Sequence, residues 1–269
     1  MADQDRRSER QRRRAEPLPA ALPPETRTVG QLVAESIRLY GRSFWRSLAL
    51  GIPLAVAGVV VAELPAFTRL PLALTAGAVA ASVSYALASA FTAGVRPEPR
   101  RIVRATEIGV VTLVPAILIL AYLGLVGLLP AVAWLAFVGL AVPVAVIESR
   151  LSLRRALELA RADLAHAIGS LATLALVGLL SAYVLFFTLR SAGTAALRAS
   201  AFLSVLVISP LLFLGASLLY FDQSARVPGV GSRPRRRRRD ADLHPAVQPD
   251  RAGRPDTQVE SGPAAGGQQ

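Results

Sequence analysis

The chain has 269 residues, of which 53% are hydrophobic, and its net charge is +12. All 30 of its basic residues are arginine, since it contains no lysine. It also contains no cysteine, which excludes disulfide bonds, thiolate nucleophiles and cysteine-based metal sites. The charges lie outside long apolar blocks, and about 20 apolar residues can cross a hydrocarbon core of about 30 Å as a helix. We therefore expect an integral membrane protein whose arginines set its orientation, with no nucleic-acid partner.

The N-terminal region combines a polar tail with a helix that lies along the membrane surface. Residues 1–27 are rich in arginine and proline, which predicts a disordered basic tail. Thr28 and Gln31 then form a capping-box pattern, followed by apolar residues at helical spacing. This predicts an amphipathic interfacial helix over 28–46. Its basic face carries three arginines that we expect to contact lipid headgroups: Arg38, Arg42 and Arg46.

Two apolar segments follow, at about 48–66 and 70–95. Glu63 lies near the outer end of the first, where we expect it to reach headgroup water or to pair with an outer arginine: Arg69, Arg190 or Arg198. The second segment carries a stripe of small residues that allows close helix approach: Ala73, Gly77, Ala81, Ser84 and Ala88. We expect this second helix to lie centrally in the bundle.

The middle of the chain contains an uncharged run that is too long for one span. A basic loop is predicted over 96–107, and residues 108–147 then carry no charge. As one straight helix this run would extend about 60 Å, roughly twice the bilayer core. A corner at Gly127 to Ala131, around a proline, would divide it into spans at 108–129 and 131–147.

A second amphipathic segment, 149–166, predicts another interfacial helix. Spans at 167–189 and 199–221 complete a membrane domain over 28–222, and a disordered basic tail is predicted over 223–269. The fold class is therefore an all-α membrane protein with six transmembrane helices and two amphipathic interfacial helices. Because alternate spans begin near residues 48, 108 and 167, the spacing favours three repeated helical hairpins.

The arginines predict the orientation of these spans. With both termini in the cytoplasm, 27 of the 30 arginines lie on the inner side, and only Arg69, Arg190 and Arg198 lie outside. An odd number of spans would place one basic tail outside, so the same bias supports six.

The last span ends in Tyr220 and Phe221, which suit the headgroup layer, followed by Asp222. Asp222 is expected to pair with Arg226 one turn later or with an arginine of an interfacial helix, such as Arg155. The candidate polar contacts at this inner rim are Glu148, Arg154, Arg155, Asp222 and Arg226. A basic cluster in the tail is expected to attract anionic lipid headgroups through Arg235, Arg236, Arg237, Arg238 and Arg239.

The sequence contains no Gly-rich phosphate loop, no nucleophile elbow and no metal-ligand spacing. We therefore expect a non-enzymatic protein without catalytic residues, metal or cofactor, which organises or senses the bilayer through cytoplasmic arginines on anionic phospholipids. The alternative is a transporter or channel subunit, because four spans contain a proline: Pro53, Pro115, Pro143 and Pro210. Homo-oligomers and partner membrane proteins both remain open.

Three stretches carry a family resemblance: Ile37 to Leu48, Pro143 to Leu171, and Leu218 to Arg226, which reads LLYFDQSAR. They resemble a prokaryotic family of uncharacterised six-helix membrane proteins, often labelled as glycerophosphoryl diester phosphodiesterase membrane domain. The resemblance covers roughly 28–227, and this chain departs from the pattern where ADLAHA replaces an aromatic-rich segment. It implies a fold and a bacterial inner-membrane location, but no catalytic activity, since the hydrophilic ends are too short for the phosphodiesterase domain.

Overall fold

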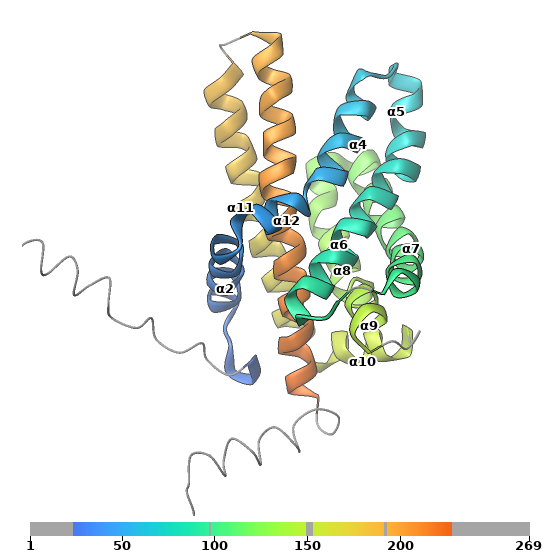
Figure 1. The fold of residues 1–269 in the computed structure, drawn as a ribbon, viewed down its shortest axis with the longest axis vertical. Coiled ribbons are helices and arrows are strands. Elements are labelled where there is room, and N and C mark those ends of the chain that lie inside the picture. The colour runs from blue at the N-terminus through green and yellow to red at the C-terminus, as the bar shows by residue number, and fades with distance from the viewer. Residues whose placement is uncertain (1–23, 97, 149–152, 191–192, 228–269) are drawn as a thin grey trace, which may run out of the picture. The chain divides into compact units, whose positions relative to one another are not determined.

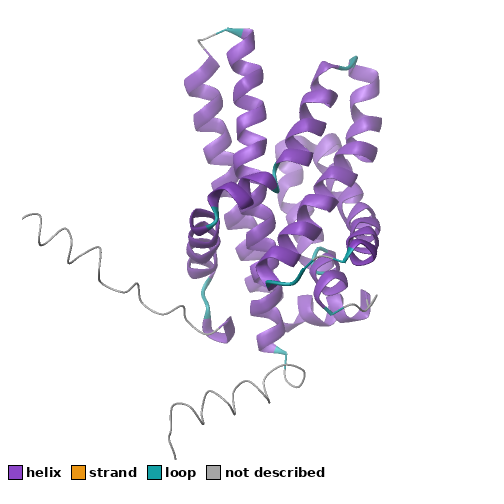
Figure 2. Ribbon diagram, in the orientation of Figure 1, coloured by secondary structure: helices purple, strands orange, loops and turns teal. Residues whose placement is uncertain are grey.

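The computed structural model describes residues 24–96, 98–148, 153–190 and 193–227. Over these residues the secondary structure is helical, without a strand, as predicted for the fold class (Figure 1, Figure 2). Within the described ranges, five segments are long and apolar enough to cross a membrane, which indicates a membrane location: Phe44–Glu63, Ala66–Ala93, Pro99–Ile147, Leu164–Leu189 and Arg198–Arg226. Most of the two predicted tails, including Arg235 to Arg239, lies outside the described residues.

Both predicted tails are shorter than the sequence suggested. A 3-10 helix, η1, forms over Pro24–Thr26, and Arg27 is only 9% exposed. At the other end, the last helix continues to Arg226, and Gln223 is fully buried. Proline and arginine content predicted disorder in these segments, whereas contacts with distant parts of the chain hold them in place.

The first interfacial helix begins where the capping box predicts and ends four residues earlier than expected. Helix α2 spans Val29–Arg42, and the backbone N–H of Thr28 donates to Gln31 Oε1 at 2.8 Å. Ser43 then leaves the helical region, with φ −131° and ψ 42°, before α3 (Phe44–Ala49) begins. This break separates the amphipathic α2 from the apolar helices that follow it.

The small-residue helix is central, as predicted. The chain continues through α4 (Ile52–Glu63), α5 (Ala66–Leu72), a π-helical turn, η2 (Ala73–Gly77), and α6 (Ala78–Ala93). Helix α6 packs against α4 and against three later helices, which are α7, α9 and α12. Three residues of the predicted stripe are buried on α6, namely Ala81, Ser84 and Ala88, whereas Ala73 and Gly77 lie on η2 and are not buried.

The long apolar run Pro99–Ile147 folds back on itself. Helix α7 (Pro99–Leu123) is followed by the 3-10 turn η3 (Gly124–Gly127), then by α8 (Leu128–Val138) and α9 (Ala141–Ile147), both of which pack against α7. The turn is therefore three residues before the predicted corner. Gly124 makes it possible, since its φ of +56° and ψ of −139° suit a residue without a Cβ.

Two further details of this run differ from the prediction. Helix α7 begins at Pro99, so most of the predicted loop 96–107 is helical. The charges of this segment hid a stripe of buried residues at helical spacing, which includes the fully buried Ala105 and then Gly109. At Gly109 an added Cβ would lie 2.7 Å from Ser82 Cβ of α6, so the two helices are in close contact there. The predicted span 131–147 is interrupted between α8 and α9, where the Tyr85 hydroxyl donates to a backbone carbonyl at 3.1 Å.

The second interfacial helix is also shorter than predicted. Helix α10 spans Leu153–Ala162, and residues 149–152 lie outside the described part of the chain. It ends because Asp163 caps the next helix, accepting a hydrogen bond from the His166 backbone N–H at 2.9 Å. Helix α11 (Leu164–Leu189) and helix α12 (Thr194–Arg226) then form an antiparallel hairpin (Figure 1).

The principal apolar core joins α2 and α10 to this last hairpin. Four of its leucines are at most 1% exposed, and each comes from a different helix: Leu32, Leu159, Leu174 and Leu219. Helices α2 and α10, which the sequence predicts to be interfacial, thus both pack against α12. The six-span count and the three-hairpin repeat stay predictions.

Candidate functional site

A cluster of buried polar side chains surrounds the last turn of α12. Asp222 and Gln223 are fully buried there, and Asp222 Oδ1 accepts a hydrogen bond from Arg27 Nη1 at 2.8 Å. A buried charge is costly unless it is paired, so each of these two side chains needs the other. The pair joins two residues 195 positions apart, one before α2 and one at the end of α12.

Arg226 completes the attachment between the two ends of the domain. Its guanidinium pairs with Asp163, the N-cap of α11, and its Nη2 donates to the backbone carbonyl of Arg27 at 3.0 Å. Gln223 Nε2 donates to the Asp163 carbonyl at 2.9 Å. The start of α2, the start of α11 and the end of α12 therefore meet in one set of contacts.

His166 lies on the remaining side of the Asp222 carboxylate. Its Nε2 is 3.7 Å from Asp222 Oδ2, which is too long for a hydrogen bond. Within the described residues neither of these two atoms has a hydrogen-bond partner. We call the six residues the Asp222 cluster: Arg27, Asp163, His166, Asp222, Gln223 and Arg226. With a neutral histidine its two arginines balance its two aspartates.

A second polar group holds α10 beside the same end of α12. The Tyr220 hydroxyl donates to Glu148 Oε1 at 2.8 Å, and Arg155 Nε lies 3.5 Å from the same oxygen. Arg155 Nη1 is also 3.7 Å from Glu158 Oε2. These contacts link the residue after α9, the amphipathic α10 and the aromatic pair that ends the last apolar run.

The predicted inner-rim residues are therefore brought together only in part. Glu148, Arg155, Asp222 and Arg226 all lie in these two groups. Arg154 does not, because its side chain is 89% exposed and pairs with Glu158 on its own helix at 3.2 Å.

The predicted partners of Asp222 are wrong. Its carboxylate pairs with Arg27, whereas Arg226 reaches Asp163 and Arg155 reaches Glu148. The sequence prediction missed Arg27 because it was assigned to the tail. It included Asp163 in the second interfacial helix, 149–166, although an aspartate directly before an apolar run is a typical N-cap.

The arginines predicted to contact lipid lie on α2 and α3. Arg42 and Arg46 are exposed. Arg38 is 32% exposed and pairs with Glu35 at 3.2 Å, so it is less available. Trp45, beside them, is 78% exposed. A basic, aromatic surface of this kind suits the headgroup layer.

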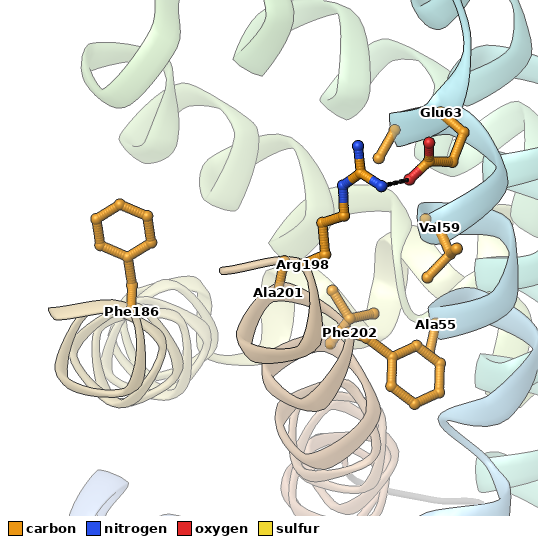
Figure 3. A pocket seen from close by; sticks show the side chains of 10 residues that line it. Ala55, Val59, Glu63, Phe186, Arg198, Ala201 and Phe202 are labelled. Atoms are coloured by element: carbon orange, nitrogen blue, oxygen red, sulfur yellow. Dashed lines mark ion pairs between the residues drawn. The ribbon is translucent and has the colours of Figure 1, made fainter. Parts of the chain in front are cut away.

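Glu63 pairs with Arg198 at 3.2 Å, one of the three partners that the sequence predicted (Figure 3). The other two arginines make different contacts. Arg69 donates to the carbonyls of Leu64, at 2.9 Å, and Ala62, at 3.3 Å, while Arg190 lies 3.8 Å over a phenylalanine ring.

The polar residues of the apolar helices bond mostly within their own helix. Ser82, Ser181 and Ser204 each donate to the carbonyl four residues earlier, at 2.6 to 2.8 Å. Ser89 does the same and also lies 3.1 Å from Ser217 of α12. Such bonds satisfy these hydroxyl groups in an apolar layer. The buried hydroxyls of Ser84 and Ser209, in contrast, have no hydrogen-bond partner among the described residues.

The four prolines are not equivalent. Pro115 and Pro210 lie in the interior of the long helices α7 and α12, which continue through them. Pro53 and Pro143 occupy the first turns of α4 and α9, where the missing N–H costs little.

Neither a metal-binding group nor a similarity to a known protein assigns a function to the described part of the chain. Among the described residues, no group of three His, Cys, Asp or Glu side chains is arranged to hold a metal ion. No family model, no curated protein and no solved structure matches the chain.

Proposed function

We propose that this chain is a multi-pass protein of a bacterial inner membrane that organises or senses the bilayer without catalysing a reaction. Its exposed arginines on α2 and α3 would contact anionic phospholipid headgroups. The observation that carries the proposal is the buried 2.8 Å pair between Arg27 and Asp222. This pair joins the start of the amphipathic helix α2 to the end of the apolar helix α12.

The pair gives a physical route from lipid charge to the bundle. Anionic lipid would attract Arg42 and Arg46, by at most about 1 kcal/mol for each charge. Leu32 of α2 is fully buried in the core that α2 shares with α10, α11 and α12, so a shift of α2 also moves its packing partners. Through Arg27 the same shift reaches Asp222 and the α11 cap.

The topology belongs to this proposal. Counting the folded run Pro99–Ile147 as two crossings gives six spans and brings both termini to the cytoplasmic side. This count agrees with the arginine bias, with 27 of 30 arginines inside. Membership of the six-helix family that the sequence resembles is proposed on the same grounds.

A transporter is the weaker candidate. It would need a polar cavity near the middle of the spans. The cavity in Figure 3 runs along α4 from Ala55 to Glu63 and along the first turns of α12, and apart from Glu63 and Arg198 its lining is apolar. Solute-uptake profiling of a deletion strain separates the candidates, since a specific uptake defect would contradict the non-transport proposal.

The lipid contact is tested by fluorescence quenching at Trp45 in a Trp134→Phe background. In vesicles, brominated phosphatidylglycerol should quench Trp45 more strongly than brominated phosphatidylcholine, because the neighbouring arginines enrich anionic lipid. The Arg42→Gln/Arg46→Gln variant should lose this difference. Arg154→Gln, which removes an exposed arginine of α10, is the matched control and should keep it. Equal quenching by both lipids in the unsubstituted α2 background would refute the proposed contact.

A further inference from the structure

A crevice opens at the other end of α12, between α4 and α12, with one side chain from α11. It encloses about 290 Å³. Its wall is formed by small and aromatic apolar side chains that include Ala55, Val59, Phe186, Ala201, Phe202 and Val205. Two charged residues belong to the lining, Glu63 from α4 and Arg198 from α12, and Figure 3 shows them facing each other across the crevice.

The Glu63–Arg198 pair leaves much of its binding capacity unused. One carboxylate oxygen contacts one guanidinium nitrogen at 3.2 Å. The Glu63 side chain is 52% exposed and that of Arg198 is 72% exposed. A guanidinium has five N–H donors and a carboxylate about four acceptor positions, so both groups can take a further ligand.

We propose that this crevice binds phosphatidylethanolamine, with part of one acyl chain in the apolar cavity. The lipid phosphate would accept from Arg198, and its primary ammonium would donate to Glu63. A chain of methylenes suits the lining, and the volume is close to the lower end of the range of about 300–1,000 Å³ typical of ligand pockets. The cavity therefore takes a segment of chain and not a whole lipid.

The charges favour this headgroup over the two other common kinds. A phosphatidylcholine headgroup carries a quaternary ammonium, which has no N–H to donate to Glu63. A phosphatidylglycerol headgroup has no cation at all, so Glu63 would face a net negative ligand. Only a headgroup with both a phosphate and a donating ammonium matches an acid and a base placed side by side.

This site is separate from the anionic-lipid surface of the proposed function. Arg198 and Asp222 are 24 residues apart on one helix, which corresponds to about 36 Å. The crevice therefore lies at the opposite end of α12 from the Asp222 cluster. The protein would contact anionic lipid at one membrane surface and an aminophospholipid at the other.

The test places a tryptophan in the crevice. Trp45 and Trp134 are replaced by phenylalanine, and Phe202→Trp supplies the single reporter. The protein is reconstituted in phosphatidylcholine vesicles that contain brominated-chain phosphatidylethanolamine, phosphatidylcholine or phosphatidylglycerol. Quenching should show a relative affinity roughly threefold higher for phosphatidylethanolamine than for the other two, the scale of a half-exposed charge contact. Phe186→Trp, on α11, is the second reporter if the first variant does not fold.

Three variants decide the result. Glu63→Gln should reduce the affinity for phosphatidylethanolamine to that for phosphatidylcholine, and Arg198→Gln should weaken binding of all three lipids. Ala201→Phe should reduce quenching by occupying the cavity. Val111 of α7 is 73% exposed, so a Val111→Trp reporter measures general lipid contact. It should show no preference among the three lipids. Equal quenching by the three lipids at position 202, or a preference that survives Glu63→Gln, would overturn the proposal.

Discussion

Among single substitutions in the Asp222 cluster, replacing Arg27 by glutamine should lower the stability of the protein most. Arg27 is 9% exposed and Asp222 is fully buried, so the substitution leaves a buried carboxylate without its cation. Among the described residues, Asp222 Oδ2 has no hydrogen-bond partner, and His166 lies 3.7 Å away. Removing one partner of a buried pair costs about 3–5 kcal/mol. We expect a loss of about 3 kcal/mol in the free energy of unfolding.

The assay is unfolding by sodium dodecyl sulfate in mixed micelles, followed by circular dichroism. Arg154→Gln is the matched control, because it breaks an exposed pair on α10 and should cost only about 0.3–0.5 kcal/mol. Asp222→Asn and the double variant Arg27→Gln/Asp222→Asn complete a cycle, in which the double variant should lose less than the sum of the single losses. Additive losses, or an Arg27→Gln protein as stable as Arg154→Gln, would refute the account of this pair.

Three further predictions concern packing, capping and topology. Gly109→Ala should destabilise by about 1–3 kcal/mol in the same assay, since its Cβ would lie 2.7 Å from a serine of α6. Gly30→Ala, which meets nothing within 4 Å on α2, should stabilise slightly; the reverse order would contradict the packing. Asp163→Ala should cost more than the ~1 kcal/mol of a lost N-cap, because it also removes the partner of the arginine at the end of α12; a loss below 1 kcal/mol would count against that pair. In this cysteine-free chain, a cysteine replacing Arg69 should react with a membrane-impermeant thiol reagent outside intact cells, whereas one replacing Glu158 should react only after lysis, and the opposite pattern would reverse the topology.

Local patterns predicted the beginnings of elements well where one signal dominated. Thr28 and Gln31 identified the start of α2, and the small-residue stripe identified α6 as central. The start of α7 was missed because charged residues surround Ala105, so the buried stripe continued unnoticed into the charged segment. Charge density and helical periodicity are different signals, and here they disagreed.

The choice of partners could not be predicted from the sequence. An i, i+4 spacing favoured Arg226 as the partner of Asp222, but Arg226 points to the cap of α11, and the buried position of Asp222 is filled by Arg27. That contact joins residues 195 positions apart and depends on how η1 packs beside α12. For Glu63 the sequence limited the possible partners to three arginines, because all three were expected at the same end of the bundle. The packing of α4 against α12 decides for Arg198.

We expect lipid charge to act on α2 and to reach the bundle through Arg27. The decisive measurement is the distance between spin labels on cysteines introduced at Ala34 of α2 and Leu153 of α10, both exposed. Between phosphatidylcholine vesicles and vesicles that also contain phosphatidylglycerol, we predict a shift of this distance in the otherwise unsubstituted protein. In Arg27→Gln the distance distribution should be broad and independent of lipid charge. An identical distribution in both lipids for the Arg27 protein would contradict the account.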